Sequence, residues 1–412
     1  MSIVVHKQEC VQFRHMSGDL FAESNMDFTS EGGLQILFRG TFGQKWRNSF
    51  GNHGNEKSFQ LDTSNYIVHN VEGGYLNRVY RLCSKNDQSQ SVFIKHAPPF
   101  IKCLGYDQPL GEERLHTEFL ALRKFQQAVP GSVPDVYFHD EETKCVVMED
   151  LRNYEVMGSQ LSQGCLDIVL VRRLASVVAK LHRNTHVATT SSSEFTTMLE
   201  TFRNEEMVAL NADMTFDLSN PANRCSPELE GPACSIRKDP EIVANIQSLH
   251  LVFLQRKECL THGDLHLGSV MVNESSVKLI DAEFAFMGPA ASDVGHILSN
   301  FIFSYAAHTL YPKEENSSID HLLREATQET VDVYFDEAKE FLSEDALATL
   351  VSQTAGFTGC HIIKWIIGIA EARDLLDKPQ AELMCLSIGA RLVKEYNMIR
   401  STQDLLRCIF DT

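Results

Sequence analysis

The sequence contains no long apolar run and no close pair of cysteines. Its longer apolar stretches, such as residues 297–307, are interrupted by polar residues and are too short to cross a membrane as a helix. The 11 cysteines include no C-x-x-C pair, which argues against a zinc site or a disulfide framework. We therefore expect mostly buried free thiols in a reducing compartment, and a cytoplasmic protein without a membrane partner.

Positive charge is also scarce. The chain has 37 Lys and Arg residues against 55 Asp and Glu residues, for a net charge of −18. This balance argues against nucleic acid or an anionic membrane surface as a partner. ATP is not excluded, because a few local cations and a magnesium ion suffice to hold its phosphates. The first residues include Glu9 and have no apolar core, so a secretory signal is not expected.

What is present is a long chain of ordinary globular composition. With 412 residues, 43% of them hydrophobic and 22% charged, the chain can bury a large core and is expected to form two lobes. We divide it into an N-terminal extension of unknown role (1–58), a nucleotide-binding lobe that ends in a hinge (59–152), and a helical lobe (153–412) with the catalytic loop and the substrate site.

Residues 261–295 are the most informative part of the sequence. The runs 270–272 and 277–280 are rich in β-branched residues and flank a polar turn, which predicts a hairpin. Asp264 then lies in the loop before the first strand, and Asp281 and Glu283 follow the second. In an extended segment, residues 281 and 283 point to one side, so both carboxylates can face one magnesium ion. One acid that accepts a hydroxyl proton, with others that hold magnesium, is what phosphoryl transfer from ATP requires.

The same segment contains residues that we expect to support the loop. In loops of this type a histidine more often orients the backbone than binds a metal, and we interpret His262 and His266 in this way. Asp293 is expected to cap the following helix and to brace the loop.

A glycine-containing turn is predicted near the start of the nucleotide-binding lobe. Residues 66–68 and 72–80 read as strand, turn and strand, with Gly73 and Gly74 in the turn. Glycines permit positive φ and let backbone N–H groups approach phosphate. We expect Gly73, Gly74 and Asn77 to cover the phosphates of the nucleotide.

The next segments of this lobe predict the rest of a nucleotide site. The strand 91–95 ends at Lys95, which is placed like a lysine that binds the α- and β-phosphates. A helix follows, with apolar residues at helical spacing, in which Glu118 can pair with Lys95. Residues 145–151 read as a strand that runs into a hinge, where backbone groups of three residues would meet the adenine edge: Met148, Glu149 and Asp150.

The remainder is predicted to be mainly helical. Residues 172–182 carry apolar side chains at i, i+3, i+4 and i+7, the spacing of a buried helix face. Residues 326–341 and 347–372 are also expected to be helices. Residues 211–239, rich in Asn, Pro and Ser, read as an irregular insertion whose two cysteines are more often isolated thiols than a bridge.

The motifs HGDLHLGS at 262–269 and DAEFAFMGPAASDVG at 281–295 resemble the aminoglycoside phosphotransferase superfamily and, within it, the 5-methylthioribose kinases. The Ser269 position together with the D-x-E motif is the more specific part. The resemblance extends over about residues 60–400 and implies an α+β fold of the two-lobed protein-kinase type, with a small antiparallel sheet in the N-lobe and a larger, mainly helical C-lobe. It also implies Asp264 as catalytic base, and Asp281, Glu283 and Ser269 as magnesium ligands.

The substrate end departs from this family. Methylthioribose kinases carry a pair of arginines in a late helix that reach the sugar, and this chain has Lys364 and Trp365 there. Lysine keeps one charge without the planar fork of arginine, and tryptophan removes the second charge. Trp365 offers instead an aromatic wall to an apolar, aromatic or cationic group. We expect both residues to contact the substrate.

The resemblance implies an ATP-dependent, magnesium-dependent kinase that converts 5-methylthioribose to its 1-phosphate in methionine salvage. The expected partners are the small-molecule substrate and a second copy in a homodimer. One alternative is a related kinase acting on another alcohol or amino alcohol. The other is a catalytically inactive nucleotide-binding module, against which the retained Asp264 and Lys95 argue. The sequence lacks the His-Arg-Asp, Asp-Phe-Gly and Ala-Pro-Glu motifs of protein kinases.

Overall fold

The computed structural model describes Lys45 and residues 66–220, 223, 225–312, 319–368 and 372–411. These residues divide into two compact units. The smaller unit includes residues 66–123 and 134–152, and the larger unit includes 124–133 and the described residues from 153 onward. The division after residue 152 falls where the sequence analysis placed the end of the nucleotide-binding lobe, whereas 124–133 groups with the larger unit. The expected extension 1–58 lies outside the described residues except for Lys45.

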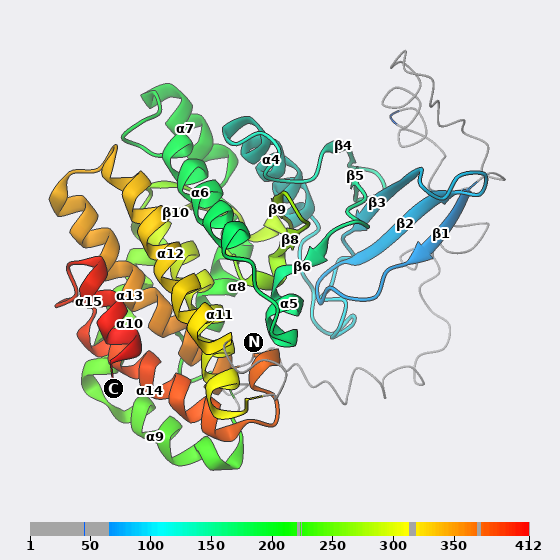
Figure 1. Ribbon diagram of the computed structural model, residues 1–412. Helices are drawn as coiled ribbons and strands as arrows, with labels where there is room; N and C mark the ends of the chain where they lie inside the picture. The colour runs from blue at the N-terminus through cyan, green and yellow to red at the C-terminus, as the bar shows by residue number, and fades with distance from the viewer. Residues whose placement is uncertain are drawn as a thin grey trace. The chain divides into compact units, whose positions relative to one another are not determined.

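The smaller unit contains a five-stranded antiparallel sheet in the order β1-β2-β3-β5-β4 (Figure 1). Its elements are β1 (Tyr66–Asn70), β2 (Arg78–Ser84), β3 (Ser91–His96), β4 (Val136–Asp140), β5 (Cys145–Glu149) and the helix α4 (Glu113–Ala128), whose last residues group with the larger unit. Val92 and Ile94 alternate along β3 and are almost fully buried, as expected of one face of a sheet. The predicted antiparallel sheet and the predicted helix after Lys95 are confirmed.

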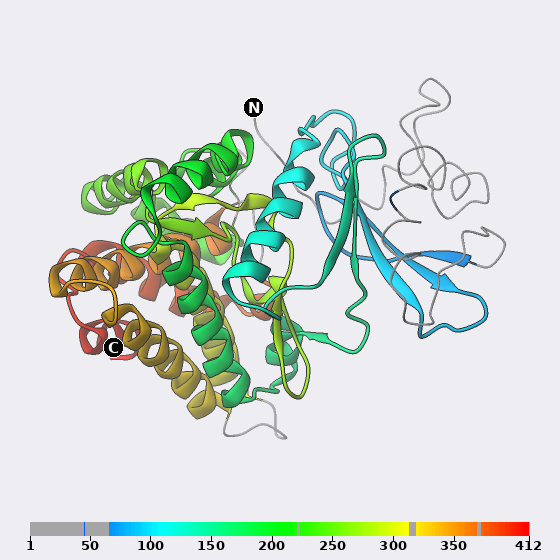
Figure 2. The same cartoon turned by 90° about the horizontal axis from the view of Figure 1, so that it is seen from above.

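The larger unit is mainly helical. Its principal helices are α5 (Met157–Gln163), α6 (Ile168–Thr185), α7 (Ser192–Thr201), α8 (Glu205–Phe216), α9 (Glu230–Lys238), α10 (Pro240–Gln255), α11 (Ala290–Leu310), α12 (Ile319–Lys339), α13 (Glu344–Ile367), α14 (Pro379–Glu395) and α15 (Thr402–Phe410). Helices α6 and α12 pack side by side, as do α11 and α13, and α13 and α14 (Figures 1 and 2). Helices α11 and α13 are buried along most of their length and form the centre of this unit.

Short strands and 3₁₀ turns complete the larger unit. They are β6 (Glu155–Val156), β7 (Cys259–Thr261), β8 (Val270–Val272), β9 (Val277–Leu279), β10 (Phe286–Gly288), η3 (Pro227–Leu229), η4 (Leu267–Ser269), η5 (Ala282–Phe284) and η7 (Arg373–Leu375). Strands β8 and β9 pair as an antiparallel hairpin with Val270 opposite Leu279, which confirms the predicted hairpin. Strand β7 pairs with β10, so the residues before and after the hairpin are also held together.

The predicted irregular insertion at 211–239 is wrong for most of its length. Helix α8 extends to Phe216 and α9 covers residues 230–238. The Asn, Pro and Ser residues masked the apolar positions that these helices bury, such as Ala212 in α8 and Ile236 in α9. The helix expected at 347–372 begins at Glu344 and ends at Ile367, and residues 369–371 lie outside the described part of the chain.

The ten cysteines that the structure describes are all free thiols, and six of them are buried. This confirms the prediction made from their spacing, and it includes Cys225 and Cys234 of the expected insertion; Cys10 lies outside the described residues. Among the described residues, every helix is too short or too polar to pass through a lipid bilayer.

Candidate active site

In the smaller unit, the glycine turn between β1 and β2 has the expected backbone form. Gly73 and Gly74 have φ of 118° and 67°, which side-chain-bearing residues rarely adopt. The turn also has a partner that sequence reasoning did not assign. The Lys102 ammonium donates to the carbonyls of Gly73 at 2.8 Å and Gly74 at 3.3 Å. Lys102 therefore satisfies the carbonyl side of the turn, and the expected contact of its N–H groups with phosphate stays a prediction.

The predicted pairing of Lys95 with Glu118 is present. The Lys95 Nζ atom at the end of β3 lies 2.7 Å from Glu118 Oε2 in α4. Both side chains are almost completely buried, with 3% and 1% of their surface exposed. A buried ammonium and carboxylate need each other, because an unpaired charge is costly away from water. The pair therefore links the position of α4 to the sheet.

Asn77 lies deeper than the sequence suggested. Its side chain is 2% exposed, and its Oδ1 atom accepts a hydrogen bond from Arg114 Nε at 3.0 Å. The guanidinium of Arg114 is itself buried and donates to backbone carbonyls just after the glycine turn, after β3 and before α4, at Leu76, Pro98, Leu110 and Gly111. Asn77 and Arg114 thus brace the second half of the glycine turn against the start of α4. The expected contact of Asn77 with phosphate stays a prediction.

The predicted hinge residues end β5 and have partners of their own. The Glu149 amide donates to Asp135 O at 2.8 Å, so it is not available to adenine. The Asp150 carboxylate accepts from Arg81, Ser91 and Arg152. Met148 is buried in the sheet between β3 and β4. The adenine contacts expected of these residues stay predictions. They now concern backbone groups other than the Glu149 amide.

In the larger unit, the loop after β7 is fixed by its neighbours. Gly263 has φ of 85°, and a Cβ there would lie 2.1 Å from Phe284 O, so only glycine fits. The amides of His262 and Gly263 donate to the two carboxylate oxygens of Asp293, at 2.7 and 3.0 Å. Asn211 Nδ2 in α8 donates to Gly263 O at 2.5 Å. These contacts hold the backbone that carries Asp264.

Asp293 braces the loop as predicted, but it does not cap the helix. Helix α11 begins at Ala290 after Pro289, so Asp293 is already within its first turn. Burial alone would raise the pKa of the Asp293 carboxyl, but the hydrogen bond with His182 and the neighbouring histidines hold this pKa below its ordinary value. The ionised carboxylate is therefore available to accept both loop amides.

The two histidines of the loop contact backbone groups, as we interpreted. His262 Nε2 lies 2.8 Å from Ile280 O, and His266 Nδ1 accepts from the Gly268 amide at 3.0 Å. The first contact joins the loop to the end of β9, and the second closes the turn that leads into β8. Both rings thus serve as supports of the loop.

Asp264 is surrounded by nitrogen-bearing side chains from its own loop and from two helices of the larger unit. Its Oδ1 atom lies 3.6 Å from His296 Nδ1 in α11 and 3.8 Å from Lys364 Nζ in α13, and its Oδ2 atom lies 3.7 Å from His266 Nε2. The histidine in α11 and the lysine are buried, whereas the Asp264 side chain keeps 25% of its surface exposed. An exposed carboxylate among buried donors is the arrangement expected of a group that meets a ligand.

Lys364 is held loosely for a buried charge. Its ammonium lies 3.5 Å from Asn211 Oδ1 and 3.8 Å from Asp264 Oδ1, at or beyond the limit of a hydrogen bond. Burial lowers the pKa of Lys364 below its ordinary value, and Asp264 offsets part of this shift. The sequence predicted a positive charge at this position of the late helix. In the structure, the Lys364 ammonium adjoins the Asp264 carboxylate.

Trp365 contacts a histidine rather than standing alone. Its indole Nε1 donates to His296 Nε2 at 3.2 Å, and the His296 ring stacks on His361 with centroids 4.1 Å apart and planes at 7°. Burial, followed by neighbouring positive groups, lowers the pKa of His296 well below its ordinary value and that of His361 to about 3. Both imidazoles are therefore neutral near pH 7.

The three residues expected to hold magnesium lie on either side of the hairpin. The Ile280 amide donates to Ser269 O at 3.0 Å, which brings the turn before β8 to the residue preceding Asp281. The expectation of an extended segment at 281–283 is wrong. Asp281 has φ of 62°, and residues 282–284 form a 3₁₀ turn, so simple alternation does not set the direction of these side chains. Two carboxylates and one hydroxyl remain a set of hard oxygen donors that suits magnesium.

Sequence reasoning missed Asn211, His296 and His361. Each is buried and comes from a different helix. Asn211 contacts the loop, His296 lies beside Asp264, and His361 stacks on His296. Polar side chains at single positions of otherwise apolar helices were the available signal, most clearly in α11 and α13. Their partners are more than 30 residues away in the sequence, so spacing alone does not reveal them.

Known proteins similar to this chain are phosphotransferases. The model of the phosphotransferase enzyme family matches residues 67–315. A methylthioribose kinase of Bacillus cereus is 31% identical over 371 residues, which cover 84% of this chain and 91% of that protein. A methylthioribose kinase of Geobacillus thermodenitrificans is 29% identical over 372 residues, with 85% of this chain and 92% of that protein covered.

Among solved structures, a choline kinase from Cryptosporidium parvum is similar with a TM-score of 0.50 and 13% sequence identity. The match covers 89% of this chain and 99% of that protein. At this identity the likeness concerns the fold alone. It agrees with the α+β fold of the protein-kinase type that the sequence predicted.

Proposed function

Because this chain belongs to the phosphotransferase enzyme family, among the methylthioribose kinases, we propose that it transfers the γ-phosphoryl group of ATP to 5-methylthioribose. The product is the 1-phosphate, formed in methionine salvage. The observation that carries this proposal is the position of Asp264: a partly exposed carboxylate on a rigid loop, adjoined by buried donors from α11 and α13. A group that accepts a proton from a bound hydroxyl needs such a fixed position.

The proposed chemistry assigns one role to each unit. In the smaller unit, Lys95, held by Glu118, binds phosphate oxygens, and the N–H groups of the glycine turn face the phosphates. In the larger unit, Asp264 accepts the proton of the acceptor hydroxyl, and the hydroxyl oxygen of the acceptor forms a bond with the γ-phosphorus. The bond to the bridging oxygen breaks, and ADP leaves. Orientation and charge stabilisation account for most of catalysis in such a transfer.

We assign Asp281, Glu283 and Ser269 as the residues that would hold magnesium. When bound, magnesium neutralises charge on the phosphates of the nucleotide. A hydroxyl in place of an amide or a third carboxylate leaves the ligand set with two charged members. This donor set suits a hard cation that keeps water and phosphate oxygens as its other ligands.

Trp365 and His296 have a proposed role in orienting the base. An indole N–H is only a donor, so His296 Nε2 must be the acceptor and its proton must lie on Nδ1. That Nδ1–H group faces Asp264 Oδ1 at 3.6 Å. A neutral histidine with a fixed tautomer can hold a carboxylate in place without taking its proton. Trp365 thus acts on the base through His296, in addition to any contact with substrate.

A second acceptor class is favoured by one observation. The Lys364 and Trp365 pair presents one buried ammonium and one aromatic ring, which is a weaker match to several sugar hydroxyls than two planar guanidinium groups. The ring suits an acceptor with an aromatic or cationic part. A related alcohol or amino alcohol is therefore the alternative acceptor within the same mechanism.

A substrate panel tests the proposal. Purified protein with ATP and magnesium is offered methylthioribose, ribose, and a set of aromatic and amino alcohols, and ADP release is measured together with the phosphorylated product. We expect the highest kcat/KM with methylthioribose. Turnover of another alcohol with none of methylthioribose would replace the salvage role and keep the kinase mechanism. ATP binding without turnover of any acceptor would favour the inactive module.

The expected cytoplasmic location and homodimer rest on the sequence. Buried free thiols support a reducing compartment for the proposed enzyme. Light scattering of the purified chain measures its oligomeric state, and cell fractionation measures its location.

A further inference from the structure

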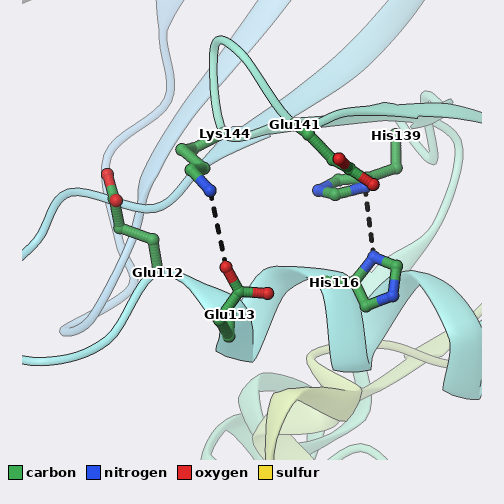
Figure 3. A pocket seen from close by; sticks show the side chains of 6 residues that line it. All are labelled: Glu112, Glu113, His116, His139, Glu141 and Lys144. Carbon is green, nitrogen blue, oxygen red and sulfur yellow. Dashed lines mark hydrogen bonds and ion pairs between the residues drawn. The ribbon is translucent and has the colours of Figure 1, made fainter.

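A cluster of possible metal ligands lies in the smaller unit, apart from the residues assigned to catalysis. His116 is in the first turns of α4, His139 is in β4, and Glu141 is in the turn that follows β4 (Figure 3). One ligand atom from each lies within 4.8 Å of the other two. Within the part of the chain that the structure describes, no other trio of His, Cys, Asp and Glu side chains meets this criterion.

The distance between the two imidazoles matches metal coordination. His116 Nδ1 and His139 Nδ1 face each other at 3.3 Å. Two nitrogens bound to one tetrahedral zinc ion at roughly 2.0–2.1 Å lie roughly 3.3–3.4 Å apart. An N–H···N hydrogen bond has a similar length, so the distance alone does not choose between the two. The third side chain is what distinguishes them, since a histidine pair joined by a hydrogen bond does not need a carboxylate.

The turn that presents Glu141 is built rigidly. Asp140 Oδ2 accepts from the amide of Thr143 at 2.9 Å and from its hydroxyl at 2.8 Å. Lys144, which closes the turn with φ of 50°, forms an ion pair with Glu113 of α4 at 3.5 Å. The turn therefore lies beside α4, and a carboxylate oxygen of Glu141 is within 4.8 Å of a ring nitrogen of each histidine (Figure 3). A rigid scaffold of this kind keeps ligands near a metal-binding geometry.

The surroundings suit a divalent cation. The His139 side chain is buried, and its Nδ1 atom faces that of His116. Glu112 and Glu113 add negative charge to the wall of the cavity, and Lys144 adds one positive charge. The Phe119 ring lies 5.5 Å from the His139 ring and covers its apolar side.

We propose that His116, His139 and Glu141 bind a divalent transition-metal ion of the zinc type, which connects α4 to the β4–β5 turn. Imidazole with one carboxylate is a ligand set for zinc, and three protein ligands leave a position for water. Residues 116 and 118 lie on opposite faces of α4, because two helical steps turn the chain by about 200°. The ion would hold the face of the helix opposite to Glu118, and so would restrict the helix that positions Lys95.

Zinc titration of the full-length, metal-free protein tests the proposal. Isothermal titration without nucleotide is compared for the wild type, His116→Gln, Glu141→Gln and the control His321→Gln, whose histidine is 84% exposed on α12. We expect one zinc site whose affinity falls at least tenfold in His116→Gln and severalfold in Glu141→Gln. The control should keep wild-type affinity. Zinc should also raise the unfolding temperature of the wild type and the control, and not that of His116→Gln.

Two further measurements distinguish this site from the thiols and from the proposed magnesium ligands. Cobalt bound by imidazole and carboxylate gives no sulfur charge-transfer band, whereas cobalt bound by thiolate does. Glu283→Gln should leave the zinc affinity unchanged. The proposal is overturned by a wild type that does not bind zinc, or by variants at 116 and 141 that bind it with unchanged affinity. Neither outcome affects the proposed kinase activity, which is measured separately.

Discussion

The two units each contain a buried lysine, and the two lysines are held in different ways. Lys95 is 3% exposed, and its ammonium lies 2.7 Å from the fully buried carboxylate of Glu118. Lys364 is 4% exposed, and among the described residues its ammonium faces Asn211 Oδ1 at 3.5 Å and Asp264 Oδ1 at 3.8 Å. One charge is neutralised within the protein, and the other is only partly satisfied.

This difference separates a lysine with a close charged partner on its own chain, in addition to its proposed contact with phosphate, from one whose described partners are distant. Removing one member of a buried ion pair leaves a costly charge. A lysine has three donors, and those of Lys364 have only distant acceptors among the described residues. We therefore expect changes at the first pair to reduce stability as well as nucleotide binding, and changes around Lys364 to reduce mainly activity.

The largest effect is expected for Asp264→Asn. The amide cannot accept the proton of the acceptor hydroxyl, so kcat should fall by about 10²- to 10⁴-fold, the usual contribution of a general base. Nucleotide affinity, measured by titration, should change little. Because Asp264 is partly exposed, the unfolding temperature should also stay near that of the wild type. Turnover within a few fold of the wild type would show that another group takes the proton.

The next largest effect is expected at Glu118, the partner of Lys95. Glu118→Gln leaves the Lys95 ammonium buried opposite a neutral amide, and should lower the free energy of unfolding by about 3–5 kcal/mol. Denaturant unfolding followed by circular dichroism measures this. Glu113→Gln on the same helix is the matched control, since Glu113 is 79% exposed and an exposed pair contributes at most about 1 kcal/mol. Equal losses for both variants would show that the buried pair contributes no more to stability than the exposed one.

Lys364→Met tests the loosely held charge. The unbranched side chain fills similar space without the ammonium, so the KM for the acceptor should rise roughly 10- to 100-fold, which corresponds to a hydrogen bond with a charged group. The KM for ATP should not change. Lys95→Met, as the comparison variant, should destabilise the protein far more, because it removes the positive charge that lies 2.7 Å from the buried Glu118 carboxylate. An unaltered acceptor KM would remove Lys364 from the substrate site.

Because of a buried histidine near Lys364, we expect the free energy of unfolding to fall in acid. Burial, followed by the charge of Lys364, lowers the pKa of His361 to about 3, against 6.5 for an ordinary histidine. Below pH 6.5 the unfolded chain therefore binds a proton that the folded chain does not, and the free energy of unfolding falls as the pH drops from about 6.5 toward 3. The slope is at most about 1.4 kcal/mol per pH unit for this group. Denaturant unfolding from pH 7 to 5 should show a smaller slope in His361→Phe and an unchanged slope in His321→Gln.

The smallest effect is expected for Trp365→Phe. The ring is kept and the indole N–H that fixes the His296 tautomer is lost, so kcat should fall roughly 2- to 10-fold, the range for one neutral hydrogen bond. The KM for the acceptor should change less than kcat, since the aromatic face remains. A rise in acceptor KM with unchanged kcat would instead indicate direct contact between the indole N–H and the substrate.

Local sequence patterns predicted the parts that depend on neighbouring residues. The glycine turn, the strand that ends in Lys95, the helix with Glu118 and the β8–β9 hairpin are each formed within a short segment. Alternation, helical spacing and turn residues report such segments because the geometry of strands and helices repeats over a few residues. Where the backbone leaves regular geometry, at Asp281 with φ of 62°, the same reasoning failed.

The surroundings of Asp264 were decided by the packing of helices. His296 and Trp365 are hydrogen-bonded across 69 residues, and Asn211 and Lys364 meet across 153. No sequence period connects such positions. Local patterns predicted the lobe types, the free thiols and the loop that carries Asp264, whose catalytic role stays a prediction. Which buried polar groups meet Asp264 depends on the packing of the helices, because burial removes water and obliges each polar group to find its partner elsewhere in the fold.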